Sequence, residues 1–114
     1  MLIDTHITLA SGDRVRLRLP QGRETAGVGA LLLRLGLDPD DFDVRRLLRF
    51  DPRRRAVVCA TLWTVDGEIL VGVGGLTYLD GHVDLLVTDE VLAPGLAEAL
   101  HGILTAAPSA RRAA

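Results

Sequence analysis

The sequence predicts an α+β domain built from an antiparallel sheet and a small number of helices. Three observations lead to this prediction. Apolar residues alternate with arginines over residues 14–19, which is the period of a half-buried strand. Two Asp-Gly pairs divide the apolar stretch 56–88 into three runs, as in a meander of strands. Apolar residues recur at helical spacing over 24–35 and again over 94–106.

The composition is that of one globular domain in a reducing compartment. We assign residues 1–107 of the 114 to this domain and 108–114 to a flexible tail. The formal net charge of −2 gives no electrostatic reason to expect nucleic acid or an anionic membrane as a partner. One cysteine excludes an internal disulfide, and no apolar run approaches the roughly 20 residues of a membrane span. We therefore expect a cytoplasmic protein. Its 13 basic residues are all arginine, which is typical of a GC-rich genome.

The first predicted element is a β-hairpin. Its strands are Ile7–Leu9 and Arg14–Leu19, and Ser11-Gly12-Asp13 supplies the turn between them. We expect the arginines of the second strand to face solvent, because successive side chains of a strand point to opposite faces. The side chains expected to face the core are Val15, Leu17 and Leu19.

Two helices are predicted next. The first covers 24–35 and ends at Gly36, a residue that suits a helix C-cap. The second covers 40–50, where acids at the start and arginines at the end complement the helix dipole. Asp51-Pro52 ends it, because proline disfavours helical backbone in the residue before it. The apolar face of the first helix consists of Val28, Leu31, Leu32 and Leu35.

The remaining strands are predicted to form a three-stranded antiparallel meander. Its strands lie at 56–65, 68–79 and 82–88. Asp66-Gly67 and Asp80-Gly81 join them, and such pairs favour type I′ turns, in which both central residues have positive φ.

The C-terminal helix is predicted from about Pro94 to Ala106, after a short loop that follows the last strand. A strand, loop and helix in this order can present backbone N–H groups of the helix N-terminus to a phosphate. Asp89 and Glu90 come just before the loop, and we interpret them as residues that cap or precede the helix. Pro94 has no N–H to donate, and no basic residue lies in the loop.

The order of these elements, together with the loop residues, resembles the first part of the GNAT superfamily of acyl-CoA-dependent N-acetyltransferases. Residues 7–18 look like the first strand pair of many bacterial members, and 67–76 are similar to the family's third strand. The family's pyrophosphate loop reads Gln/Arg-x-x-Gly-x-Gly/Ala. Here Gly95 and Ala97 match that pattern, whereas Leu92 stands at the leading polar position.

This resemblance implies an acetyl-CoA site at the end of the last strand and the start of the last helix. In the family, acyl-CoA lies in a cleft where the fourth and fifth strands splay apart. The family's fifth strand, fourth helix and last strand pair have no counterpart here, so the resemblance is to a truncated GNAT-like fold. The usual tyrosine acid lies in the missing part. The implied cofactor-binding residues are Leu86, Val87, Gly95, Leu96 and Ala97.

Asp84 is the candidate catalytic residue. The resemblance implies that an acid near the last strand can serve as general base for the acceptor amine. A base needs a raised pKa and access to that amine, directly or through water. The alternative interpretation is an outward carboxylate on a half-solvated face of the sheet.

Several other residues have structural interpretations. Gly72, Gly74 and Gly75 lie in a strand with no helix after them, so they indicate a bulge or a close backbone approach rather than a dinucleotide site. Cys59 lies in an apolar strand and is expected to be a buried, inert thiol. Trp63 belongs to the core or to an interface, and an exposed Trp63 would favour the interface.

The histidines and the densest basic cluster are not predicted to form a site. His6, His82 and His101 share no ligand spacing, so we expect no metal. The basic cluster is interpreted as a solvated, ion-paired face, the alternative being a site for an acidic acceptor, a CoA phosphate or nucleic acid. Its members are Arg45, Arg46, Arg49, Arg53, Arg54 and Arg55.

The predicted sheet ends in an open edge at 82–88, and an apolar edge must be paired or covered. We expect two copies to form a homodimer through this edge, so that the second chain completes the cleft. Three functions stay open. The first is an N-acetyltransferase related to GNAT enzymes, and the second is a module that binds acetyl-CoA without catalysis. The third is an inactive structural or regulatory scaffold that forms a homodimer or binds a protein partner.

Overall fold

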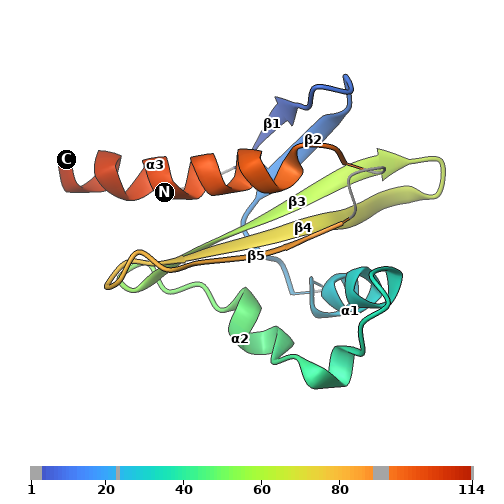
Figure 1. Cartoon of the computed structure of the whole chain (residues 1–114), viewed down its shortest axis with the longest axis horizontal. Coiled ribbons are helices and arrows are strands. Elements are labelled where there is room, and N and C mark those ends of the chain that lie inside the picture. Colours follow the sequence, from blue (N-terminus) through green and yellow to red (C-terminus); the bar gives the residue numbers. More distant parts are fainter. Residues whose placement is uncertain (1–3, 23, 89–92, 114) are drawn as a thin grey trace.

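The observed architecture is a five-stranded antiparallel sheet with helices on both faces (Figure 1). The computed structural model describes residues 4–22, 24–88 and 93–113, with side chains through 106. The strands lie in sequence order, as β1 (Asp4–Thr8), β2 (Arg14–Arg18), β3 (Arg55–Thr64), β4 (Gly67–Thr77) and β5 (Val83–Val87). The helices are α1 (Glu24–Arg34), the 3-10 helix η1 (Pro39–Asp41), α2 (Val44–Leu48) and α3 (Leu96–Ala113).

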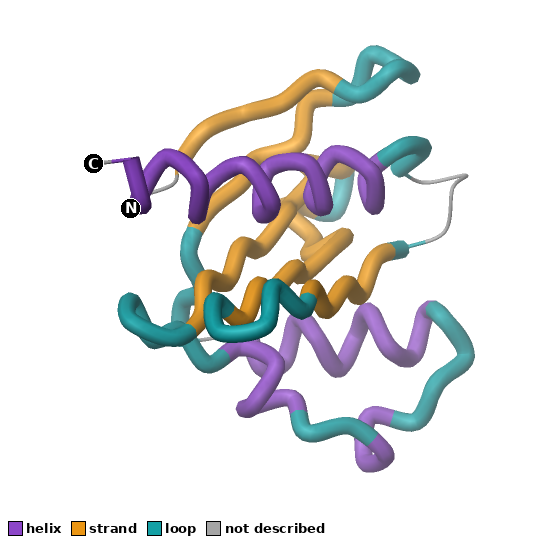
Figure 2. Tube along the Cα trace, turned by 60° about the vertical axis from the view of Figure 1, so that its left-hand side comes forward, coloured by secondary structure: helices purple, strands orange, loops and turns teal. Residues whose placement is uncertain are grey.

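Helix α3 covers one face of the sheet (Figure 2). Its side chains Leu96, Leu100 and Leu104 are almost completely buried against the strands. Two glycines of β4 permit this close approach. A Cβ on Gly74 would lie 2.7 Å from Cδ1 of Leu104, and a Cβ on Gly72 would lie 3.1 Å from Leu96 and Leu100. The prediction of a close backbone approach is therefore confirmed for these two glycines.

Helices α1 and α2 lie on the opposite face (Figure 2). Val28 and Leu32 of α1 pack there against Val57, Cys59 and Val73 of the two central strands. Helix α1 lies over β4, where Gly27 allows the helix backbone to approach Leu70. The α1 face is therefore apolar under the helix, and a polar region lies beside it over β2 and β3.

The predicted hairpin, first helix and meander are confirmed, but the prediction of type I′ turns is wrong. Such turns need positive φ at both central residues, and no non-glycine residue in the described ranges has positive φ. Thr64 pairs with Gly67 across the first turn, so Val65 and Asp66 are its central residues. Only the glycines of the two turns, Gly67 and Gly81, have positive φ, at 108° and 70°.

The single helix predicted at 40–50 is wrong, because two aspartates begin separate short helices. Asp38 accepts a hydrogen bond from the backbone N–H of Asp40 and begins η1. Asp43 accepts one from the N–H of Arg46 at 3.0 Å and begins α2. An N-cap residue has non-helical backbone, so a cap inside the predicted span divides it into two helices.

The last helix differs from its prediction at both ends. It begins at Leu96 rather than Pro94, and it continues to Ala113 rather than ending near residue 106. Asp89 and Glu90, interpreted above as capping residues, lie outside the described residues. The flexibility of 108–114 and the boundary of the domain at 107 stay predictions.

Candidate functional site

The predicted cofactor residues meet where β5 ends and α3 begins. Leu86 and Val87 are the last two residues of β5, and both are half-buried. Gly95 stands directly before α3 with φ of +78°, a conformation that glycine adopts without strain. Leu96 is fully buried, so its side chain belongs to the core. The structure therefore brings the predicted residues together. A ligand at this junction would meet backbone groups rather than polar side chains.

The start of α3 resembles an anion site, but it has fewer available N–H donors than a usual helix start. The first N–H groups of a helix have no intrahelical acceptor, and the helix dipole favours negative charge there. The N–H of Leu96 is already bonded to the carbonyl of Ala93 at 3.3 Å, and Pro94 has no N–H. Any phosphate at this end would therefore depend on the following N–H groups of the first turn, beginning with that of Ala97. Leu92, at the family's leading polar position, lies outside the described residues.

Strand β5 is an edge of the sheet. Among the described residues it pairs only with β4. The N–H of Thr88 donates to the carbonyl of Val71, and the carbonyl of His82 accepts from Thr77, so the even-numbered residues point their backbone groups toward β4. By alternation, the odd-numbered residues point theirs to the open side. The N–H and C=O groups at this open side belong to Val83, Leu85 and Val87.

The candidate base Asp84 lies near the start of β5, at the opposite end of the strand from the entry to α3. Its Oδ1 lies 2.8 Å from Nε2 of His82, and its Oδ2 lies 3.7 Å from Nη2 of Arg55. These two partners hold the carboxyl group in place, and the side chain is 46% exposed. A carboxylate in this setting is a structural ion-pair partner in the conformation observed.

Arg55 departs from the solvated face predicted for the arginine cluster. Its guanidinium is half-buried and donates to the carbonyls of Leu47 at 2.7 Å and Arg49 at 3.1 Å. A Cβ on Gly75 would overlap this guanidinium. Unlike Gly72 and Gly74, this glycine of β4 therefore leaves space for an arginine rather than for a helix. Burial lowers the pKa of Arg55 from its ordinary value, and Asp84 opposes that effect. Arg55 thus ties the end of α2 to the sheet.

The structure has a pocket on the α1 face that was not predicted from the sequence. Arg18 was expected in solvent, yet it is 8% exposed and forms an ion pair with the buried Glu24 of α1. The prediction for Arg18 is therefore wrong, because the start of α1 covers this side of β2. The pocket beside the pair has a volume of about 560 Å³, and Trp63 and Glu68 also line it. The alternation that placed the arginines on one face was the signal available in the sequence.

Cys59 lies in the core of the sheet, away from solvent. Cys59 is fully buried, as predicted, and burial raises the pKa of its thiol to about 12. No group of three or more histidine, cysteine or acidic side chains that could hold a metal occurs in the part of the chain that the structure describes. Over the same residues, no helix has both the length and the hydropathy needed to span a membrane.

Comparison with known proteins gives a match among the solved structures. No family model matches the sequence, and no curated protein matches it either. Among solved structures, the chain is similar to the GNAT domain of PAT from S. lividans. The two are 19% identical with a TM-score of 0.67, over 95% of this chain and 73% of that chain.

The match assigns the architecture. A mixed α/β chain with this antiparallel sheet, with α1 and α2 on one face and α3 on the other, has a GNAT-like fold. The resemblance to the GNAT superfamily, predicted from the order of elements, is therefore confirmed at the level of the fold. At 19% identity the likeness is one of fold, and it assigns no substrate and no catalytic residue.

Proposed function

We propose that this protein binds acetyl-CoA at the junction of β5 and α3, as a relative of GNAT N-acetyltransferases. The observation that carries the proposal is the combination of an open β5 edge with the start of α3 at Leu96, directly after Gly95. The GNAT-like fold supports it, because Gly95 and Ala97 of this junction match the family's pyrophosphate-loop pattern in the sequence.

The chemistry of the ligand fits the two parts of this junction. The pyrophosphate of acetyl-CoA would lie against the first free backbone N–H groups of α3, near Ala97. The pantetheine arm contains two amides, which can add to the outward N–H and C=O groups of Leu85 and Val87 as a strand would. Gly95 supports this placement, since a residue without a side chain lets the ligand approach the backbone.

A homodimer is part of the proposal. Two β5 edges related by a two-fold axis would pair with each other, which leaves acetyl-CoA only the helix end, or stand side by side with the pantetheine arm between them, so that the second copy supplies the other wall of the acyl-CoA cleft. The exposed fraction of Leu85, 36%, supports an edge that is covered in the assembled protein.

A catalytically inactive scaffold is the second candidate, and the position of Asp84 favours it. A general base must reach the acceptor amine, whereas Asp84 is held by His82 and Arg55 at the end of β5 away from the start of α3. In this version the same fold forms a homodimer or binds a protein partner, with or without acetyl-CoA.

Calorimetric titration of acetyl-CoA into the purified chain tests the proposal. Gly95→Asp and Gly95→Asn form a matched pair, because both side chains tolerate positive φ and only the first adds a negative charge beside the pyrophosphate. We expect saturable binding that weakens at least tenfold in Gly95→Asp and less in Gly95→Asn.

Gly102→Asp is the control for charge. It adds the same carboxylate to the exposed side of α3, about two turns away from the junction. Equal weakening by Gly102→Asp, or no binding of acetyl-CoA near millimolar concentration by the folded chain, would contradict the proposal. The second result would favour the scaffold.

A further inference from the structure

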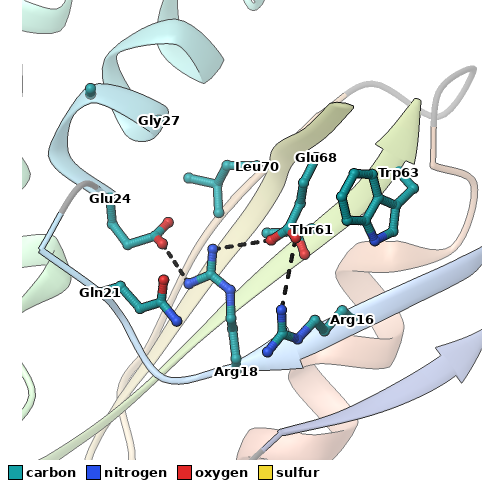
Figure 3. Close-up of a pocket in the computed structure, with 10 residues that line it drawn as sticks. Arg16, Arg18, Gln21, Glu24, Gly27, Thr61, Trp63, Glu68 and Leu70 are labelled. Atoms are coloured by element: carbon teal, nitrogen blue, oxygen red, sulfur yellow. Dashed lines mark hydrogen bonds and ion pairs between the residues drawn. The ribbon is translucent and has the colours of Figure 1, made fainter. Parts of the chain in front are cut away.

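On the α1 face of the sheet, polar side chains of β2, β3 and β4 lie beside the start of α1. Cross-strand pairing places Arg16 beside Thr61, and Thr61 beside Leu70. Closer to the turn between β3 and β4, Trp63 pairs with Glu68. These side chains share one face, because alternate residues of a strand point the same way. Together with their neighbours, these side chains line the pocket of about 560 Å³, a volume in the size range of small-molecule sites (Figure 3).

The charged groups of this pocket are fixed by one another. Arg18 bonds Glu24 through Nη1 and contacts Glu68 through Nη2 at 3.3 Å. Arg16 donates two hydrogen bonds of 2.9 Å to the carboxylate of Asp4, and its Nη1 lies 3.8 Å from Oε2 of Glu68. Figure 3 shows Glu68 between the two guanidinium groups. The two arginines and two glutamates lining the pocket balance in charge, so the pocket does not select a strongly charged ligand.

Two buried polar atoms of the pocket residues lack a hydrogen-bond partner among the described residues. They are Nε of Arg18 and Oγ1 of Thr61. Thr61 is 3% exposed and Arg18 is 8% exposed, so bulk water does not satisfy these groups. An unsatisfied buried polar group costs stability, and such groups persist where a bound molecule completes them. Nε–H is a donor only, and the hydroxyl can donate or accept, so the missing partner carries an acceptor oxygen or nitrogen.

Trp63 gives the pocket a flat apolar wall at its mouth. It is 71% exposed, although a tryptophan usually buries most of its surface. Its position on β3 keeps the indole beside the polar groups rather than in either core. An exposed indole offers a stacking surface to a planar ring.

We propose that this pocket binds a small planar ring that bears a carbonyl oxygen, as an aromatic carboxamide or carboxylic acid does. The ring stacks on Trp63, and the oxygen accepts from Thr61 Oγ1 and Arg18 Nε at the floor. The site involves neither β5 nor α3, so it is independent of the proposed acetyl-CoA site. A failure of acetyl-CoA binding therefore leaves this proposal standing, and the reverse also holds.

Fluorescence titration tests the proposal directly, because Trp63 is the only tryptophan in the chain. Benzamide, benzoate and benzylamine are the probes, and cyclohexanecarboxamide controls for the flat ring. We expect saturable changes of Trp63 emission with benzamide or benzoate, and at least fivefold weaker binding of benzylamine and cyclohexanecarboxamide. The two oxygen-bearing probes separate a neutral carboxamide from an anionic acid. Preference for benzylamine would overturn the proposal, as would the absence of saturable binding by both benzamide and benzoate.

Two variants separate a binding role from a structural one. Thr61→Val keeps the shape and removes the unpartnered hydroxyl, so we expect binding five- to tenfold weaker with unchanged or higher resistance to urea. Trp63→Leu, followed by calorimetry, is expected to weaken binding at least tenfold. Thr5→Val, an exposed threonine of β1 outside the pocket, is the matched control and should change neither property. Unaltered affinity in both pocket variants would place the probes elsewhere and overturn the proposal.

Discussion

Single residues of this protein acquire their chemistry from packing, and Cys59 is the simplest case. The thiol lies between the central strands and the α1 cluster, with no solvent exposure. Burial disfavours the thiolate and raises the pKa from the ordinary 9.0 to about 12. A thiol in this environment is a small apolar side chain and not a nucleophile.

This raised pKa predicts a pH dependence of stability. The unfolded chain loses its thiol proton near pH 9, while the folded chain keeps it until about pH 12. The unfolded state therefore binds fewer protons in that window, and the contribution of the thiol to the free energy of unfolding is full below pH 9 and falls by about 1.4 kcal/mol per pH unit above it.

Urea unfolding of the parent chain and Cys59→Ala between pH 8 and pH 11 measures this effect. The difference between the two free energies should shrink as pH rises, because alanine has no proton to lose. A difference that stays constant over the whole window would show that the thiol titrates normally in the folded chain.

The arginines illustrate the same dependence on context. Arg18 and Arg55 look in sequence like the exposed arginines beside them, yet each has a fixed structural task. Arg18 holds α1 to the sheet through Glu24, and Arg55 holds the carbonyls at the end of α2. In both cases the partners lie only six to eight residues away, across a turn of the chain that composition does not reveal. That is why the periodicity that placed the arginines on a face did not show which of them would be buried.

At the scale of elements, the two glycines of β4 under α3 determine how closely that helix packs. Gly74→Ala would place a methyl group 2.7 Å from the buried Leu104, so we expect a loss of about 1–3 kcal/mol through overpacking. Gly102→Ala, on the exposed side of the same helix, has no neighbour within 4 Å and should stabilise by up to about 1 kcal/mol. Urea unfolding of the two variants should thus give opposite signs. Equal effects would show that α3 can shift away from β4 without cost.

Elements with a strong local pattern could be predicted from the sequence, and those defined by capping could not. The β3–β4–β5 meander follows from two Asp-Gly pairs and long apolar runs, and it is observed. The helix at 40–50 fails, because Asp43 caps a new helix where charge patterning alone suggests a continuous one. The residues predicted to bind a cofactor lie near one another at the β5–α3 junction, and their role stays a prediction. The pocket of Arg18 and Thr61 forms only when α1 packs on the sheet. The alternation of arginines indicates their common face, but it does not predict the pocket.

At the scale of the whole molecule, the open edge of β5 is expected to decide the oligomeric state. The N–H of Leu85 points away from β4, so Leu85→Pro removes an edge donor without removing a hydrogen bond between β4 and β5. We expect the parent chain to sediment as a dimer at tens of micromolar and Leu85→Pro as a monomer. Leu85→Ala keeps the N–H and controls for the loss of the side chain. A parent chain that is monomeric at this concentration would contradict the dimer.

The strictly sequential order of the strands has a consequence for how fast the chain folds. Three of the four strand pairs, β1–β2, β3–β4 and β4–β5, connect segments separated by short turns. Only β2–β3 must close the long excursion 19–54 that holds α1 and α2. Since loop closure is the entropic cost that slows β proteins, the meander can form early, and joining it to the N-terminal hairpin becomes the rate-limiting search. A chain with this topology need not wait for the distant pairing of its first and last strands.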